Sequence, residues 1–363
     1  MGERKVKFLD KHDNLDLTRF EMEYLKGKKP VIISNSFKWK ALEKWNLDYF
    51  KKIYPDKMVA LTVLNPTQNT LGSNVTLKLP EAIELINNNT DKNKKYYLMQ
   101  RSVHDEFPEL IPDIAIPNYA DNSNIHVVNL WVGEKGINTK PHHDYYNNFL
   151  TQIFGRKRVR LFPPSDTQFL YPYSMNDTMT VEGVQYPTVH VSQIADIDLV
   201  DTNEFPDIKL ATSFEGVLNP GDLLYIPAGW WHEVKSLDVT MSINFWWKIR
   251  IEEFPLQQLA IQVGSYFNWF GDSFHNRIRS AFDLSEYRDD LQVAEFCLLK
   301  NLKCVSAFFL LTYLDRMLIN INTDFKVNKI LEWKKYLEVS KNCIDELLDS
   351  KKILHIINET KIM

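Results

Sequence analysis

The stretch Thr139-Lys-Pro-His-His-Asp144, followed far downstream by Trp230-Trp-His232, decides how this sequence is interpreted. Successive side chains of a β-strand alternate between its two faces, so a strand through the first stretch places His142 and Asp144 on the same face. His143 then points to the opposite face. We expect His232 to arrive from a distant strand and to complete a set of two imidazoles and one carboxylate.

These three residues form a candidate metal site. Two histidines and one carboxylate occupy one face of an octahedral metal ion and leave the other face open, which is typical of non-haem Fe(II) oxygenases. The alternative is that His142 and His143 are surface residues of a strand and that His232 is an interior histidine with satisfied hydrogen bonds. We favour the metal site because the turn Asn219-Pro-Gly-Asp222 leads through a strand into Trp-Trp-His232.

Residues 125–250 are predicted to form an antiparallel jelly roll, because short strand-like stretches alternate there with turn signals. Gly155-Arg-Lys157 is predicted to be a hairpin turn between two of these strands. The segment 172–216 is rich in Asp, Thr and Pro and is predicted to be an insertion. The expected strands cover residues 125–132, 148–154, 159–163, 223–227 and 240–247.

The regions on either side of the jelly roll have a different character. Residues 1–124 are predicted to form an α/β segment that packs on the barrel and completes it. Its helices are expected at 15–30, 45–54 and 80–87, and its strands at 29–34, 59–64 and 96–100.

Residues 251–363 carry apolar residues at helical spacing and are predicted to form a C-terminal α-helical domain. Within it, Phe308-Phe-Leu-Leu-Thr-Tyr-Leu314 could form the contact of a homodimer. The alternative is a helical bundle that packs on its own barrel.

Composition narrows the class of protein. The 363 residues are 44% hydrophobic and 25% charged, as in globular proteins with a substantial core. The net charge of −4 gives no basic field for nucleic acid. Three cysteines without a CxxC pair indicate a reducing compartment, and the N-terminus lacks the apolar run of a signal peptide. Val305–Leu314 is too short to span a bilayer, so we expect a cytoplasmic protein and no membrane partner.

Several motifs, taken in order, resemble the JmjC hydroxylases, the Fe(II)- and 2-oxoglutarate-dependent branch of the cupin superfamily. The resemblance covers about residues 30–250. Their order and spacing are similar to the asparaginyl hydroxylases, and Gln100-Arg-Ser with Glu106-Phe-Pro-Glu-Leu is similar to the small lysyl hydroxylases. The matching segments are Leu130-Trp-Val-Gly-Glu, Thr139-Lys-Pro-His-His-Asp, Asn148-Phe-Leu-Thr-Gln-Ile-Phe-Gly-Arg-Lys157, Arg160-Leu-Phe-Pro-Pro, Pro220-Gly-Asp-Leu-Leu-Tyr-Ile-Pro, Trp230-Trp-His232 and Asn244-Phe-Trp246.

The resemblance implies a double-stranded β-helix with iron between its two sheets, held by His142, Asp144 and His232. It implies that Lys157 pairs with the distal carboxylate of 2-oxoglutarate, which physically needs a cationic partner in an apolar barrel. Without the resemblance, Lys157 would be an ordinary basic turn residue.

Further positions are assigned by the same resemblance. Thr139 and Tyr97 match residues whose hydroxyls hold that carboxylate, although a turn threonine and a core tyrosine are the simpler interpretation. Asn148 and Asn244 match polar groups near the iron and the co-substrate. Trp246 is expected to wall the site or fill the core, and Trp230-Trp231 to be packing residues.

The function expected from this resemblance is the hydroxylation of a protein or peptide side chain, with dioxygen as co-substrate and release of succinate and CO2. Demethylation of N-methyl-lysine uses the same iron chemistry and is one alternative. Hydroxylation of a modified tRNA base is another, which the near-neutral charge disfavours. A non-catalytic cupin used for binding is the alternative from a different class, and the presence of all three metal positions with Lys157 argues against it.

Overall fold

The computed structural model describes residues 5–65, 73–120, 125–173, 177–181, 184–250, 253–255 and 258. Met1–Tyr173 and His190–Ile249 belong to one compact unit, and Ser174–Val189 and Arg250–Met363 to a second. The first unit holds every candidate site residue. The helices predicted within 251–363 and the dimer contact predicted at 308–314 lie outside the described residues.

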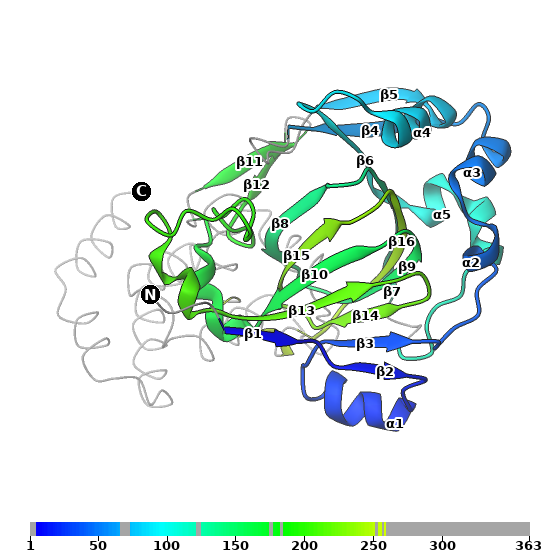
Figure 1. Cartoon of the computed structure of the whole chain (residues 1–363). Coiled ribbons are helices and arrows are strands. Elements are labelled where there is room, and N and C mark those ends of the chain that lie inside the picture. The colour runs from blue at the N-terminus through cyan, green and yellow to red at the C-terminus, as the bar shows by residue number, and fades with distance from the viewer. Residues whose placement is uncertain are drawn as a thin grey trace, which may run out of the picture. The chain divides into compact units, whose positions relative to one another are not determined.

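The core of the first unit is a jelly roll of eight strands divided between two facing sheets (Figure 1). Its strands are β7 (Ile125–Gly133), β8 (Asn138–His143), β9 (Asn147–Phe154), β10 (Lys157–Phe162), β13 (Thr212–Leu218), β14 (Leu223–Ile226), β15 (Trp231–Ser236) and β16 (Thr240–Trp247). The order β13-β10-β15-β8 lies in the smaller sheet and the order β14-β9-β16-β7 in the larger one. The predicted mostly β core is therefore confirmed.

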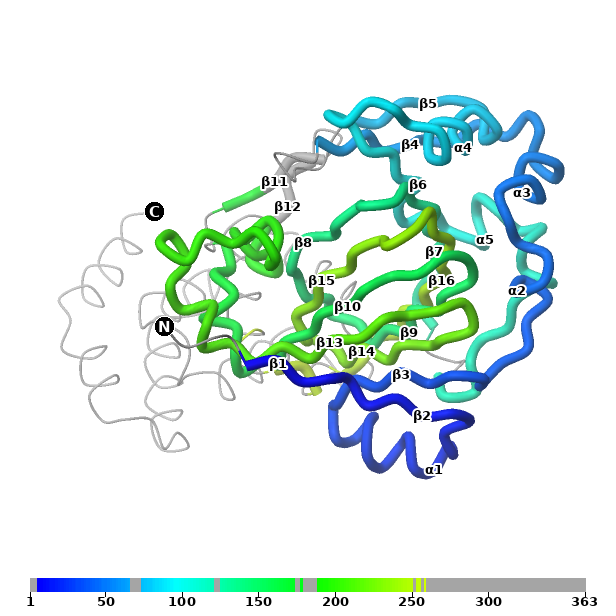
Figure 2. The backbone as a smooth tube through the Cα atoms, viewed as in Figure 1, coloured from blue at the N-terminus to red at the C-terminus, as the bar shows by residue number. Residues whose placement is uncertain are grey.

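N-terminal strands extend both sheets. They are β1 (Lys5–Phe8), β2 (Lys11–Asp13), β3 (Val31–Ser34), β4 (Met58–Leu64), β5 (Asn74–Lys78) and β6 (Lys95–Ser102). Strand β1 pairs in parallel with β13, and β2 pairs in parallel with β3, so one short segment joins the edges of the two sheets (Figure 2). Strand β6 pairs directly with β7, so the sheet continues across the expected boundary at residue 124.

Helices of the N-terminal region cover the outer face of the larger sheet. They are α1 (Leu17–Arg19), η1 (Phe20–Leu25), α2 (Ala41–Lys44), α3 (Leu47–Ile53), α4 (Leu79–Asn88), α5 (Val103–Glu106) and η2 (Pro108–Asp113). The helix expected at 45–54 begins at Leu47, because the Asn46 side chain accepts a hydrogen bond from the Tyr49 N–H and caps it. No helix within the described ranges is long and apolar enough to cross a membrane.

Both faces of the central strand β9 are buried. Asn148 and Leu150 line a cavity inside the barrel, whereas Phe149 and Ile153 pack into the core beneath the helices. This explains why polar and apolar residues do not simply alternate along Asn147–Phe154, since a strand covered on both faces loses that alternation.

The turn at Gly155 corrects one prediction. Strands β9 and β10 belong to different sheets, so Gly155-Arg-Lys157 carries the chain across the barrel and does not close a hairpin. Gly155 has φ +66°, and a Cβ there would lie 2.1 Å from the Val239 carbonyl oxygen. Only glycine meets both the backbone conformation and the close approach.

The predicted insertion is shorter than expected. Residues 212–216, placed within it by composition, belong to strand β13 of the barrel, which ends at Leu218. The segment before β13 contains the short helices η4 (Pro164–Leu170) and η5 (Pro206–Leu210). Strands β11 (Thr178–Val181) and β12 (Val184–Pro187) form an antiparallel pair that belongs to the second unit.

A buried arginine ties this segment to the smaller sheet. Arg160 on β10 is only 4% exposed and donates to Glu215, Glu233 and Asp198 at 2.8, 2.8 and 2.9 Å. Burial would raise the pKa of the Asp198 carboxyl, but hydrogen bonds from Arg158 and Arg160 hold that pKa well below its usual range. One cation therefore compensates carboxylates from β13, β15 and the segment between η4 and η5.

We expect Arg160→Met to lower the free energy of unfolding by about 3–5 kcal/mol near neutral pH, because the buried Glu233 carboxylate loses its cation. Asp198 stabilises the native state above its unfolded pKa of about 4, and that contribution is lost as the pH falls through its lowered folded pKa. The difference between wild type and variant should therefore shrink toward about pH 3.

Urea unfolding at several pH values measures this difference. The control is Arg156→Met, which breaks an exposed ion pair with Asp238 and should cost less than about 1 kcal/mol. Equal losses in both variants would contradict the role assigned to Arg160.

Candidate metal centre and its cavity

An extra residue in strand β8 sets the geometry of the candidate site. His142 pairs with His232 on β15, but Thr139 pairs with Val234, so three steps along β8 match two steps along β15. Pro141 lies in this bulge, where its missing N–H leaves no gap in a regular ladder. The bulge turns Thr139 and His142 to the same face, and both line the cavity inside the barrel.

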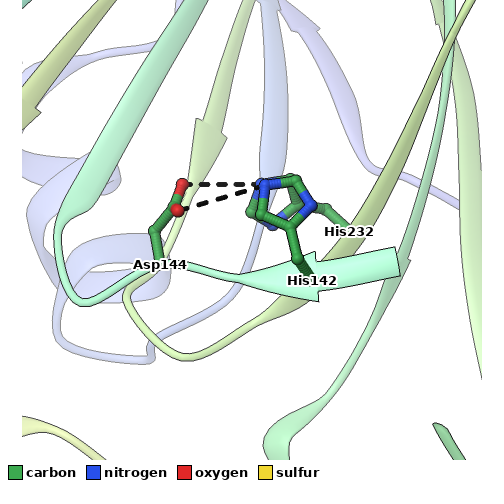
Figure 3. Close-up of side chains that lie close together, drawn as sticks. All are labelled: His142, Asp144 and His232. Atoms are coloured by element: carbon green, nitrogen blue, oxygen red, sulfur yellow. Dashed lines mark ion pairs between the residues drawn. The ribbon is translucent and has the colours of Figure 1, made fainter. Parts of the chain in front are cut away.

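The structure brings together the three residues that the sequence singled out. Asp144 lies directly after the end of β8, and its Oδ1 and Oδ2 are 4.0 Å from His142 Nε2 and 3.5 Å from His232 Nε2 (Figure 3). One ligand atom from each residue lies within 4.8 Å of the others, close enough to hold one metal ion. His143 lies on the other face, where its ring packs edge-on against Trp231.

Backbone carbonyls orient both imidazoles. His142 Nδ1 lies 2.9 Å from the Lys140 carbonyl oxygen, and His232 Nδ1 lies 3.0 Å from that of Trp230. Because a carbonyl only accepts, each Nδ1 must donate, and each Nε2 keeps its lone pair toward Asp144. Metal-ligating histidines are commonly fixed in this way by a hydrogen bond from the second ring nitrogen.

Desolvation shifts the pKa values of two of these residues in directions that favour metal binding. It lowers the pKa of His232 well below its usual value, which keeps that imidazole neutral. It also raises the pKa of Asp144, because a buried carboxylate loses its hydration. A divalent cation would compensate that carboxylate, and the donor set of two imidazoles and one carboxylate suits Fe(II).

The free edge of β8 is held by an edge segment, residues 190–192, that the sequence analysis assigned to the insertion. The His143 N–H donates to the His190 carbonyl at 2.9 Å, and the Ser192 N–H donates to the Pro141 carbonyl at 2.8 Å. The buried Ser192 hydroxyl also accepts from the Ile194 N–H at 3.0 Å. The alternation of apolar and polar residues from Val189 to Ser192 is the signal that could have identified this strand-like pairing.

Lys157 lines the same cavity, and it pairs with Ser236, four residues beyond His232 on β15. Its side chain is 2% exposed, its Nζ donates to the Ser242 hydroxyl at 2.7 Å, and burial lowers its pKa to about 7. Among the described residues no carboxylate forms an ion pair with it. Thr139 and Tyr97, which share a hydrogen bond, line the same cavity. This end of the cavity therefore offers an ammonium group and hydroxyls to an anion.

Two asparagines connect the walls of the cavity. The Asn244 carbonyl oxygen accepts from Trp131 Nε1 at 2.6 Å and from Asn129 Nδ2 at 3.2 Å, while its Nδ2 donates to Asn148 Oδ1 at 3.2 Å. Asn129 and Trp131 were not identified from the sequence. Asn129 lies opposite Asn244 and Trp131 opposite Ser242, which would have been visible only once the register of β7 and β16 was known.

A row of stacked aromatic rings begins at the wall of the cavity. Trp246 lines the cavity and stacks on Tyr146 at 5.5 Å between ring centroids, and Tyr146 stacks on His126 at 4.9 Å. The sequence analysis anticipated Trp246 and missed the other two. Trp230 and Trp231 are buried and donate to the Lys28 carbonyl and the Thr167 hydroxyl, as packing residues do.

The chain is similar to known proteins over the region just described. A sequence model of the family described as "Cupin-like domain" matches residues 17–253. The chain is 33% identical over 254 residues to "Lysine-specific demethylase JMJ30" of Arabidopsis thaliana, covering 68% of this chain and 56% of that protein. It is also 33% identical over 239 residues to "Lysine-specific demethylase 8" of Danio rerio, covering 64% and 56%.

A third relative carries a different name. The chain is 26% identical over 255 residues to "tRNA wybutosine-synthesizing protein 5" of Gallus gallus, covering 65% of this chain and 76% of that protein. The match spans a little over half the length of each demethylase.

Lys157→Met should stabilise the ligand-free protein by roughly 1–4 kcal/mol at about pH 7, because it removes the cost of burying a cation. Since the folded pKa is lowered, the unfolded state binds the proton more tightly between about pH 7 and pH 10. Wild-type stability should therefore rise across that range, and the advantage of the variant should disappear near its upper end.

Urea unfolding with and without a dicarboxylate checks this. A dicarboxylate should raise the stability of the wild type and leave Lys157→Met unchanged, whereas Lys92→Met, at an exposed position, should behave as wild type. A loss of stability in ligand-free Lys157→Met would show that Lys157 is a structural residue.

Proposed function

We propose, since this chain belongs to the JmjC group of the cupin-like domain family, that it is an Fe(II)- and 2-oxoglutarate-dependent oxygenase that hydroxylates a protein or peptide side chain. Members of this family are 2-oxoglutarate-dependent oxygenases. One observation carries the proposal: a metal-type triad and a buried lysine, for which the described residues provide no carboxylate partner, line one cavity of about 60 Å³.

In this proposal His142, Asp144 and His232 hold Fe(II). The donor set fits, because both imidazoles present Nε2 and because desolvation raises the pKa of the Asp144 carboxyl, a cost that a bound cation would offset. When bound, iron and 2-oxoglutarate supply the activation of dioxygen, and the co-substrate leaves as succinate and CO2. The chain itself fixes the two imidazoles through the hydrogen bonds of their Nδ1 atoms.

Lys157 is assigned to the distal carboxylate of 2-oxoglutarate. A carboxylate beside Nζ would favour the ammonium form and offset the burial that lowers the pKa of Lys157 to about 7. Thr139 and Tyr97 add hydroxyl donors at the same end. Asn148 and Asn244 are assigned to the co-substrate nearer the metal, and Trp246 to the wall that the prime substrate passes.

The class of prime substrate is the finer part of the proposal. A protein or peptide is supported by two relatives whose printed names contain "Lysine-specific demethylase", and by a net charge of −4 that offers no field for nucleic acid. The asparaginyl type that the motif spacing resembles is not singled out by these relatives. Those names favour demethylation of N-methyl-lysine as the second candidate, and the wybutosine-synthesizing relative supports a tRNA base as a third.

Anaerobic absorption spectroscopy with Fe(II) and then 2-oxoglutarate tests the site without any prime substrate. We expect a visible charge-transfer band in the wild type and none in Asp144→Ala, which lacks the only carboxylate of the triad. Lys157→Met should still bind Fe(II) but should need about 100-fold more 2-oxoglutarate, the effect of losing a strong charge-assisted contact. Absence of the band in the wild type would make a non-catalytic binding protein the leading interpretation.

Product analysis separates the three substrate classes. Hydroxylation of a peptide adds the mass of one oxygen atom, and demethylation of a methyl-lysine peptide releases formaldehyde. A tRNA substrate should bind with an affinity that falls steeply with salt. Formaldehyde without any stable mass gain, or oxidation of tRNA alone, would replace the proposed protein hydroxylation.

A further inference from the structure

A second cavity lies outside the barrel and shares no residue with the metal centre. It has a volume of about 250 Å³ and is lined by two segments, residues 36–39 after strand β3 and residues 115–119 before strand β7. The metal cavity, by comparison, is about 60 Å³. A space of this size between two ordered segments can hold a small molecule rather than only a water.

The walls of this outer cavity are mainly aromatic and apolar. Phe37 and Trp39 pack against each other at 4.3 Å between centroids, and Tyr119 is held by its hydroxyl, which donates to the Leu15 carbonyl. Ile116 and Pro117 complete the apolar lining. Such walls suit the body of a planar or aromatic molecule, which can stack or pack edge-on against them.

The polar side chains that line the outer cavity favour an anion as ligand. The Ser36 hydroxyl is buried and has no hydrogen-bond partner among the described residues. Lys38 lines the cavity and forms no ion pair within the described part of the chain. The lining contains no Asp or Glu, so a carboxylate could accept from Ser36 and Lys38 without repulsion from a lining acid.

We propose that this outer cavity binds a small aromatic carboxylate. The ring would occupy the space beside Phe37, Trp39 and Tyr119, and the carboxylate would lie toward Ser36 and Lys38. The proposal concerns a site separate from the metal centre, so it does not depend on the oxygenase activity proposed above.

The outer cavity lies behind two strands that carry residues of the metal cavity. Trp39 packs against Phe245 at 5.7 Å, and Tyr119 packs against Phe149 at 6.2 Å. Phe245 and Phe149 are directly paired across β16 and β9, and their neighbours Asn244 and Asn148 line the metal cavity on the opposite face. A ligand in the outer cavity would thus contact side chains that back the walls of the metal centre.

Binding of benzoate to the full chain, measured by saturation-transfer NMR and calorimetry, tests the proposal. We expect saturable binding, weakened about fivefold in Lys38→Gln, as for the loss of one exposed ion pair, and also weakened in Ser36→Ala. Lys40→Gln, at an exposed position outside the cavity, should bind as wild type. Neutral benzamide should bind more weakly than benzoate.

A second arm excludes the other lysine that could attract benzoate. Binding should persist in Lys157→Met and should not be displaced by 2-oxoglutarate. The proposal is overturned by the absence of saturable binding, by equal affinity in wild type and Lys38→Gln, or by loss of binding in Lys157→Met alone. None of these outcomes bears on the Fe(II) and 2-oxoglutarate titration, so the two proposals succeed or fail separately.

Discussion

The extra residue in strand β8 is the constraint on which the site depends. A regular strand would send Thr139 and His142 to opposite faces, and the cavity would lose either its metal ligand or its hydroxyl. The bulge at Lys140-Pro141 turns both inward and presents the Lys140 carbonyl to His142 Nδ1. An irregular strand is costly at a free edge, and the edge segment 190–192 satisfies the backbone groups that it exposes. The bulge and its covering segment therefore act together.

The polar groups around Lys157 lower the stability of the barrel and suit the binding of a ligand. Lys157 is buried with a hydroxyl as its hydrogen-bond partner, and Gln152, on the strand that pairs with β16, keeps a buried side-chain oxygen without a partner within the described residues. A core built only for stability would fill this space with apolar side chains, as the neighbouring Leu150, Val159 and Leu161 do. Polar groups left partly satisfied in this way are more economically explained by a ligand than by the fold.

The sequence predicted that His142, Asp144 and His232 lie together, and it predicted most core strands, because both depend on local spacing. His-x-Asp needs only the two-residue period of a strand, and β7, β9 and β16 are marked by dense apolar residues. What failed depends on distant partners. The Gly155 turn has the same composition whether it closes a hairpin or crosses between sheets, and only pairing with β13 and β15 distinguishes the two. Residues 212–216 look like an insertion because Glu215 faces Arg160, a partner that composition cannot reveal.

The short segment that joins the edges of the two sheets has a kinetic consequence. Strand β1 pairs with Thr212–Glu215 of β13. During synthesis these partner residues leave the ribosome much later than β1. Contacts of such high sequence separation carry a large loop-closure cost and slow folding. During synthesis the apolar residues of β1, Val6 and Phe8, have no strand to pair with until β13 emerges. We therefore expect the pairing of β1 with β13 to form late in folding.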